Sequence, residues 1–104
     1  MDKINGRIIE LLKEKGANRM AEMIAQRREK GIKEYGQDID AANLTAKEVQ
    51  QHLVEELLDA AVYAEKLLDI LDKQKESMTY YRINIAKSVI IAQIAKIEDI
   101  EQSK

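Results

Sequence analysis

The chain has 104 residues, of which 45% are apolar and 35% are charged, and it contains no Pro, Trp, Phe or Cys. This composition favours helices, and the lack of cysteine excludes disulfides, thiolate catalysis and Cys-ligated zinc. Seventeen basic and nineteen acidic residues nearly cancel, so no global field attracts nucleic acid or an anionic membrane. We expect one soluble, cytoplasmic, all-α domain that binds neither nucleic acid nor membrane, and whose small core favours a homodimer or homotetramer.

Two short helices are predicted in the first part of the chain. The first covers roughly residues 2–15, with Asp2 as its N-cap and Gly16 as a left-handed stop. Its apolar residues recur at helical spacing: Ile4, Ile8, Leu11 and Leu12. A second helix starts near Asn18 as a possible cap and stops at Gly36, and the polar residues that follow, up to Leu44, predict the longest loop.

Two longer helices are predicted after this loop. Thr45 followed by Glu48 is a capping box, and the helix that it opens can run to about Lys75. Thirty residues make a rod of about 45 Å, which is longer than a compact globule of this size at about 33 Å. Ser77 is expected to cap a fourth helix that reaches about Glu101. We expect a four-helix bundle rather than a heptad coiled coil, because the apolar positions are broader than a two-per-seven seam.

Polar and titratable residues form a stripe on the predicted third helix. One broad apolar arc of this helix is expected to be core, and it comprises Val49, Leu53, Leu57, Ala60, Ala61, Ala64, Leu67, Leu68 and Leu71. Glu56 falls at the edge of the arc, Asp59 lies one turn on, and His52 and Tyr63 share their side. Carboxylates at i and i+3 converge above the helix, and Mg²⁺ or Mn²⁺ prefers such oxygen ligands.

A structural interpretation of the same residues stays open. Glu55 and Asp59 can simply face water, while Glu56 pairs with a Lys or Arg of a neighbouring helix. Acidic pairs at this spacing are common on solvated helices, so the stripe alone does not decide between a metal site and a helix surface.

A longer stretch of the third helix resembles a known family. The run Gln51-His52-Leu53-Val54-Glu55-Glu56-Leu57-Leu58-Asp59-Ala60-Ala61-Val62-Tyr63 is similar to the second metal-binding helix of the MazG-like, all-α NTP pyrophosphohydrolases, particularly the small phage and prophage forms. Upstream, Lys33-Glu34-Tyr35-Gly36, a polar loop and a Leu before the capping Thr resemble the lead-in of those forms. The resemblance covers about residues 20–70 and implies a MazG fold.

The family pattern is Glu-x-x-Glu on one helix and Glu-x-x-Asp on the next. Glu56-Leu57-Leu58-Asp59 supplies the second half, while the first half is Gln26-Arg27-Arg28-Glu29. This keeps one carboxylate, Glu29, and replaces the other with an amide, which is a weaker metal ligand. Glu22, one turn earlier, is a possible substitute, and three carboxylates suit one hydrated Mg²⁺ better than two ions.

The resemblance implies hydrolysis of a nucleoside triphosphate between the α and β phosphates, giving monophosphate and pyrophosphate. In that reaction Glu29, Glu56 and Asp59 would bind Mg²⁺ or Mn²⁺, Glu55 would be the general base or an extra metal ligand, and His52 would orient a carboxylate or water. The alternative for His52, the only histidine, is a surface or capping residue.

Basic residues near Glu29 suit the triphosphate by charge, and Arg also suits it by bidentate geometry: Arg27, Arg28, Lys30 and Lys33. They equally fit a solvated helix face. Tyr63 could stack on the base, or lie in the core with its hydroxyl at the rim. The rival to an enzyme is a non-catalytic helical interaction protein, possibly a degenerate member of the same family, whose apolar faces bind a partner.

Overall fold

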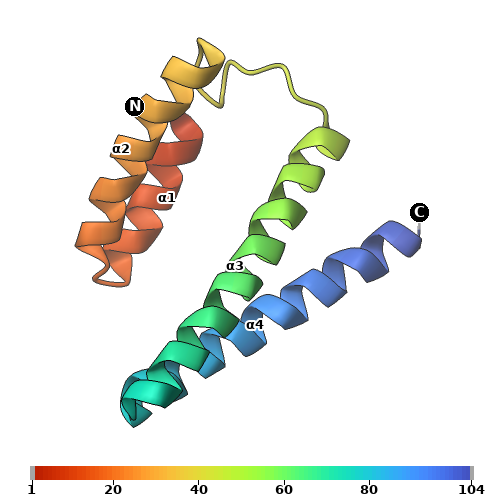
Figure 1. The fold of residues 1–104 in the computed structure, drawn as a ribbon. Helices are drawn as coiled ribbons and strands as arrows, with labels where there is room; N and C mark the ends of the chain where they lie inside the picture. Colours follow the sequence, from red (N-terminus) through yellow and green to blue (C-terminus); the bar gives the residue numbers. More distant parts are fainter. Residues whose placement is uncertain (1, 104) are drawn as a thin grey trace. The chain divides into compact units, whose positions relative to one another are not determined.

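The computed structural model describes residues 2–103, apart from the side chain of Tyr35, and this part contains four α-helices, the turns and loop that join them, and no strand (Figure 1). The all-α fold class is therefore confirmed. The helices form two compact units, Met1–Leu44 and Thr45–Lys104, and each unit is one antiparallel helix pair. The elements are α1 (Lys3–Glu14) and α2 (Asn18–Tyr35) in the first unit, and α3 (Ala46–Gln74) and α4 (Ser77–Gln102) in the second.

Two of the predicted N-caps are confirmed. The Asp2 side chain accepts a hydrogen bond from the Asn5 backbone N–H at 2.8 Å. The Thr45 hydroxyl accepts one from the Glu48 backbone N–H at 3.1 Å, and the Glu48 carboxylate accepts one from the Thr45 backbone N–H at 3.3 Å. The second pair is a complete capping box, which fixes where the 29-residue α3 begins.

The other two predicted caps are wrong, because Asn18 and Ser77 are the first helical residues and Ala17 and Glu76 precede them without a side-chain cap. The turns explain the difference. The Ala17 N–H bonds back to the Leu12 carbonyl at 2.8 Å, and the Glu76 N–H bonds back to the Leu71 carbonyl at 3.0 Å. These bonds close Schellman motifs after α1 and α3. The residues that donate them, Ala17 and Glu76, are also the N-cap positions of α2 and α4.

Left-handed residues end three helices. Gly16 has a φ of 76° and Gly36 a φ of 75°, so both predicted glycine stops are confirmed. The equivalent residue after α3 is Lys75, with a φ of 57°. A side chain in this conformation costs about 1 kcal/mol relative to glycine, which has no Cβ to clash.

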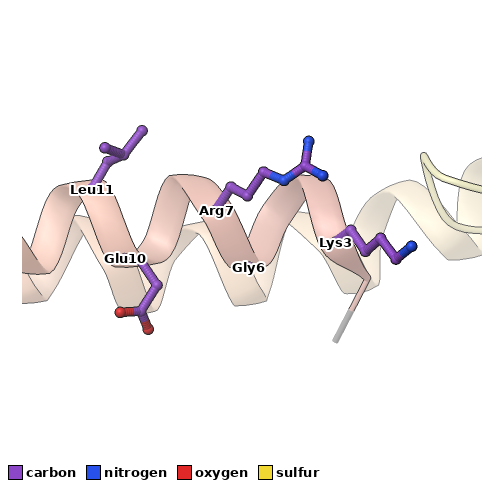
Figure 2. A pocket seen from close by; sticks show the side chains of 5 residues that line it. All are labelled: Lys3, Gly6, Arg7, Glu10 and Leu11. Atoms are coloured by element: carbon purple, nitrogen blue, oxygen red, sulfur yellow. The ribbon is translucent and has the colours of Figure 1, made fainter.

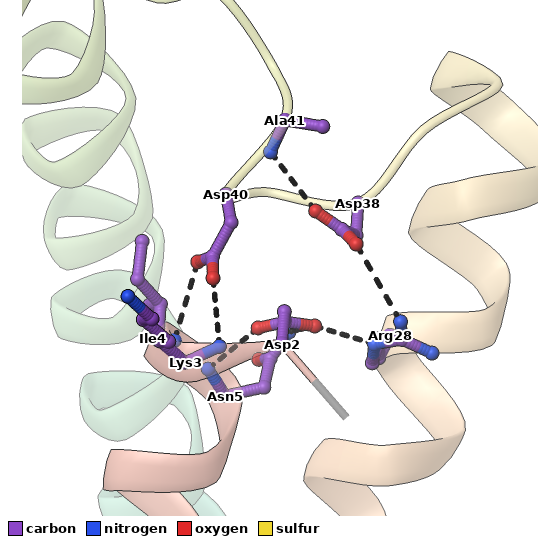
Figure 3. A network of polar contacts seen from close by, with 8 residues as sticks. All are labelled: Asp2, Lys3, Ile4, Asn5, Arg28, Asp38, Asp40 and Ala41. Carbon is purple, nitrogen blue, oxygen red and sulfur yellow. Dashed lines mark hydrogen bonds and ion pairs between the residues drawn. The ribbon is translucent and has the colours of Figure 1, made fainter.

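Within the first unit, α1 and α2 are joined by a polar network (Figure 3). Ala21 is buried at 3% exposure. The Asp2 carboxylate, with only 1% of its side chain exposed, forms an ion pair with Arg28 of α2, and Arg28 also lies 3.7 Å from Asp38. Asp40 accepts hydrogen bonds from the first backbone N–H groups of α1 at 2.7 and 3.2 Å. The loop after α2 therefore holds the start of α1.

The Asp2 carboxyl is acidic for a buried group. Burial raises its pKa, but hydrogen bonds from the backbone and side chain of Asn5, and then the contact with Arg28, lower it more. The net effect holds the pKa well below its ordinary value, because the charged form receives these donors. Asp2 is therefore both the cap of α1 and its electrostatic link to α2.

Within the second unit, α3 and α4 meet along one seam. Leu68 at 2% exposure and Leu71 at 7% are its most buried side chains. Positions shielded from solvent alternate at spacings of three and four residues, as in an antiparallel coiled-coil pair: Val54, Leu57, Ala61, Ala64, Leu68 and Leu71 on α3, and Ile83, Lys87, Ile90, Ile94 and Ile97 on α4. Two exposed hydrogen bonds also join the helices, from Gln50 to Glu101 at 3.0 Å and from Lys87 to Glu65 at 2.8 Å.

Part of the arc expected to be core on α3 is exposed. Val49 is 46% exposed, Leu53 50% and Leu67 39%. The expectation was wrong for these positions because a single neighbouring helix covers only the seam, whereas the apolar arc is wider. None of the helices in the described part has the length and apolar character needed to cross a bilayer.

Candidate carboxylate site

The stripe predicted on α3 lies on one continuous helix. With about 100° per residue, His52, Glu56, Asp59 and Tyr63 fall within a sector of about 60°, and all four are exposed. This sector points away from the seam with α4. Tyr63 is 76% exposed, so the interpretation of this ring as core does not hold within this unit.

Glu55 lies beside this sector rather than within it, about 100° around the helix from Glu56. Its carboxylate accepts a hydrogen bond from the Gln51 amide at 3.0 Å, and the other oxygen lies 4.0 Å from Nδ1 of His52. That second distance is beyond a hydrogen bond and is a charge contact only when the imidazole is protonated. His52 therefore neighbours Glu55, the residue expected to be the general base.

Glu56 and Asp59 differ from Glu55 in having no side-chain partner among the residues that the structure describes. Between residues 2 and 103 neither carboxylate takes part in a hydrogen bond or ion pair with a side chain. The alternative in which Glu56 pairs with a Lys or Arg of a neighbouring helix is therefore not observed there. Two exposed, uncompensated carboxylates at i and i+3 repel each other unless a cation lies between them.

The donors fit a hard divalent ion in type. Carboxylate oxygens without a protein partner suit Mg²⁺ or Mn²⁺, which keeps several waters when few carboxylates bind it. Among the described residues no group of three or more Asp, Glu or His side chains is close enough to hold a metal ion. The α3–α4 unit alone thus offers two ligands, and Glu29, the expected third, belongs to the α1–α2 unit.

Glu29 is exposed on α2, on the same side as Glu22, Gln26 and Lys33. These four positions share a sector of about 60°, while Arg27 lies about 160° around the helix from Glu29 and Lys30 about 100°. The expected basic patch is therefore divided over two sides of α2. Of its members, Lys33 shares the side of Glu29.

Arg28 stands apart from the other basic residues. It is half-buried, and its guanidinium contacts Asp2 and Asp38 (Figure 3). These contacts place Arg28 at the junction of α1 and α2. They give no support to the expectation that Arg28 binds phosphate. The sequence held a signal for this role, because Arg28 follows Ala21 and Ile24 on the apolar side of α2 at helical spacing.

Two surface hollows lie elsewhere. One runs along α1 beside Gly6 and is open to solvent, with Lys3, Arg7, Glu10 and Leu11 around it (Figure 2). The other, of about 160 Å³, lies at the turn between α3 and α4 and is lined by Leu71, Asp72, Lys75, Glu76, Ser77 and Tyr80. Neither contains a residue of the stripe on α3.

Comparisons with protein-family models, with curated proteins and with solved structures found no match to this chain. The likeness to the MazG-like enzymes therefore depends on the residues quoted from the sequence alone.

Proposed function

We propose that the chain is a metal-dependent nucleoside triphosphate pyrophosphohydrolase, which converts an NTP or dNTP to the monophosphate and pyrophosphate. The observation that carries this proposal is the pair Glu56 and Asp59, which are exposed on one side of α3 and form no side-chain hydrogen bond or ion pair among the described residues 2–103. Their sequence context supports it, since the same stretch carries the resemblance to the MazG-like family. Glu29 is the third proposed ligand.

In the proposed reaction, water attacks the α-phosphorus and the anhydride bond between the α and β phosphates is cleaved. Pyrophosphate leaves with the bridging oxygen, and Glu55 accepts the proton of the attacking water. The Gln51 amide donates a hydrogen bond to the Glu55 carboxylate at 3.0 Å and so orients it, and His52 lies beside the other carboxylate oxygen. A bound Mg²⁺ or Mn²⁺ supplies charge neutralisation at the phosphates and a more acidic water.

The remaining side chains would bind the substrate. Lys33, on the side of Glu29, provides a positive charge for phosphate oxygens. Arg27 and Lys30 lie on the other side of α2 and would contribute only long-range charge. Tyr63, exposed in the sector of Glu56, offers an aromatic face for a base.

The proposal is tested by pyrophosphate release from a panel of NTPs and modified dNTPs with Mg²⁺ or Mn²⁺. Glu56→Gln and Asp59→Asn should each abolish turnover and remove the rise in melting temperature that Mn²⁺ gives the wild type. Both variants should remain folded, because they relieve like-charge repulsion. Glu98→Gln, an exposed change on α4, is the matched control and should retain activity.

A further variant separates the proposed roles. Glu55→Gln should lose turnover and keep the Mn²⁺-induced rise in melting temperature, because it removes a proton acceptor and not a ligand. Absence of turnover with every nucleotide, together with no metal-induced stabilisation of the wild type, would refute the enzyme.

The second candidate is a non-catalytic helical interaction protein. It is favoured by large apolar side chains that remain exposed on α3 and α4, such as Val62 at 68% and Met78 at 66%, since contiguous exposed apolar surface marks interaction sites. Under this alternative the Glu56 and Asp59 variants would leave partner binding unchanged, and no nucleotide would be hydrolysed.

A further inference from the structure

The loop after α2 is fastened to the first turn of α1 by a carboxylate (Figure 3). Asp40 accepts hydrogen bonds from the backbone N–H groups of Lys3 at 2.7 Å and Ile4 at 3.2 Å. The next N–H group, that of Asn5, donates to Asp2 at 2.8 Å. The first N–H groups of a helix have no partner within it. At the start of α1 they are divided between a local cap and a residue of a distant loop.

The two carboxylates differ in how firmly they are held. The Asp2 side chain is only 1% exposed and forms an ion pair with Arg28 of α2. Asp40 is exposed, and so are both of its hydrogen bonds. Exposed hydrogen bonds compete with water and are weakened by salt, whereas a buried charge pair is costly to break. Asp40 can therefore leave the start of α1 while Asp2 continues to cap it.

Asp38 supports the attachment of Asp40. One oxygen of its carboxylate accepts a hydrogen bond from the Ala41 backbone N–H at 2.9 Å, and the other lies 3.7 Å from the Arg28 guanidinium. The Ala42 N–H also donates to the Asp38 carbonyl at 3.0 Å. Asp38 thus closes a turn around Asp40 and links this turn to α2 by a long charge contact.

The attachment shortens the free connection between the two units. Gly36 ends α2 and Thr45 caps α3, so the eight residues 37–44 join them. With Asp40 held at α1, only the four residues 41–44 lie between the fixed point and Thr45. At ~3.5 Å per residue, the maximum reach of the connection is about 14 Å from a bound Asp40 and about 28 Å from Gly36 after release.

We propose that Asp38 and Asp40 form a releasable strap that sets the length of the connection between the two units. When the strap is released, the number of free residues doubles while both helix pairs stay folded. The effective concentration of one linked unit at the other depends on linker length. Glu29 and Glu56 belong to different units, so the strap would regulate how readily these proposed ligands meet. This last consequence rests on the proposed function, whereas the strap itself does not.

The first test measures the strap directly. Amide exchange with water, followed by NMR at fixed pH, should be at least ~5-fold faster at Lys3 and Ile4 in Asp40→Ala than in the wild type. Exchange at Asn5 should not change, because its partner is the local cap. Gln37→Ala, an exposed change in the same loop, is the matched control and should exchange as the wild type does. Equal rates at the first two amides in Asp40→Ala and the wild type would overturn the proposal.

The second test measures the connection. The chain has no cysteine, so Arg19→Cys on α2 and Lys66→Cys on α3, both exposed positions, allow one spin label on each unit. Combining Asp38→Ala with Asp40→Ala should widen the label-to-label distance distribution from double electron–electron resonance by about 5 Å. Gln37→Ala should leave its width unchanged. A distribution of the same width with and without the strap residues would refute their control of the connection.

A measurement on the wild type remains decisive if a strap variant fails to fold. Raising the NaCl concentration from about 0.05 M to about 1 M should accelerate exchange at Lys3 and Ile4 more than at Asn5, because salt screens exposed contacts more strongly than buried ones. The same proportional change at all three amides, or no change at any of them, would contradict a strap that opens while Asp2 stays in place.

Discussion

Leu68 is the side chain on which the α3–α4 seam depends most, and its truncation gives the sharpest stability prediction. It is 2% exposed, so Leu68→Ala removes buried methyl groups and leaves a cavity beside α4. This should lower the free energy of unfolding by about 3 kcal/mol. For a domain of this size that corresponds to a fall in melting temperature of about 15 °C.

The matched control is Leu58→Ala, since Leu58 lies on the same helix and is 47% exposed. It has the same change in helix propensity but leaves no enclosed cavity, so it should cost about 1 kcal/mol or less. Urea unfolding followed by circular dichroism, at one fixed protein concentration, measures both. Equal losses for the two variants would show that α3 and α4 do not pack along the seam described.

Two further predictions concern the ends of helices. Lys75→Gly should raise the free energy of unfolding by up to about 1 kcal/mol, because Lys75 has a φ of 57° and glycine adopts this conformation without strain. Thermal melts measure the effect, with Lys73→Gly inside α3 as a control that should be destabilised. A loss of stability in Lys75→Gly would contradict the prediction. For Asp2, the folded-state pKa lies below the ordinary value of 3.8, so its stabilising contribution is present above about pH 4 and is lost as the pH falls below that value. The stability advantage of the wild type over Asp2→Asn should therefore shrink on acidification, and an advantage that is constant across this range in parallel melts would refute the assignment.

The local features of the fold could be predicted because their causes lie within one helical turn. The capping box of Thr45 and Glu48, the glycine stops at Gly16 and Gly36, and the cap at Asp2 each depend on residues three or four positions away. Asn18 and Ser77 were wrongly assigned as caps because the preceding Schellman turns already fix the start of the next helix. Such a turn is set by the conformation of two helices together and not by one side chain.

Features that depend on distant residues were not predictable. The apolar arc of α3 gave no indication of which part α4 would cover. Leu68 and Leu53 are both leucines of this arc, but only Leu68 is buried in the structure. The pairing of Arg28 with Asp2 joins residues 26 positions apart, so Arg28 was counted among the basic residues of a binding patch. For the candidate site, helical spacing placed His52, Glu56 and Asp59 on one side of α3, and the uncompensated state of the two carboxylates emerged only from the structure.

The most direct test of the account is a phosphorus NMR time course of a nucleoside triphosphate mixed with the wild type or with Asp59→Asn, in the presence of Mg²⁺. If Glu56 and Asp59 form a metal-dependent hydrolytic site, the triphosphate signals give way to those of monophosphate and pyrophosphate with the wild type only. Loss of the γ-phosphate alone, equal conversion by both proteins, or an unchanged triphosphate across the nucleotide panel would contradict it.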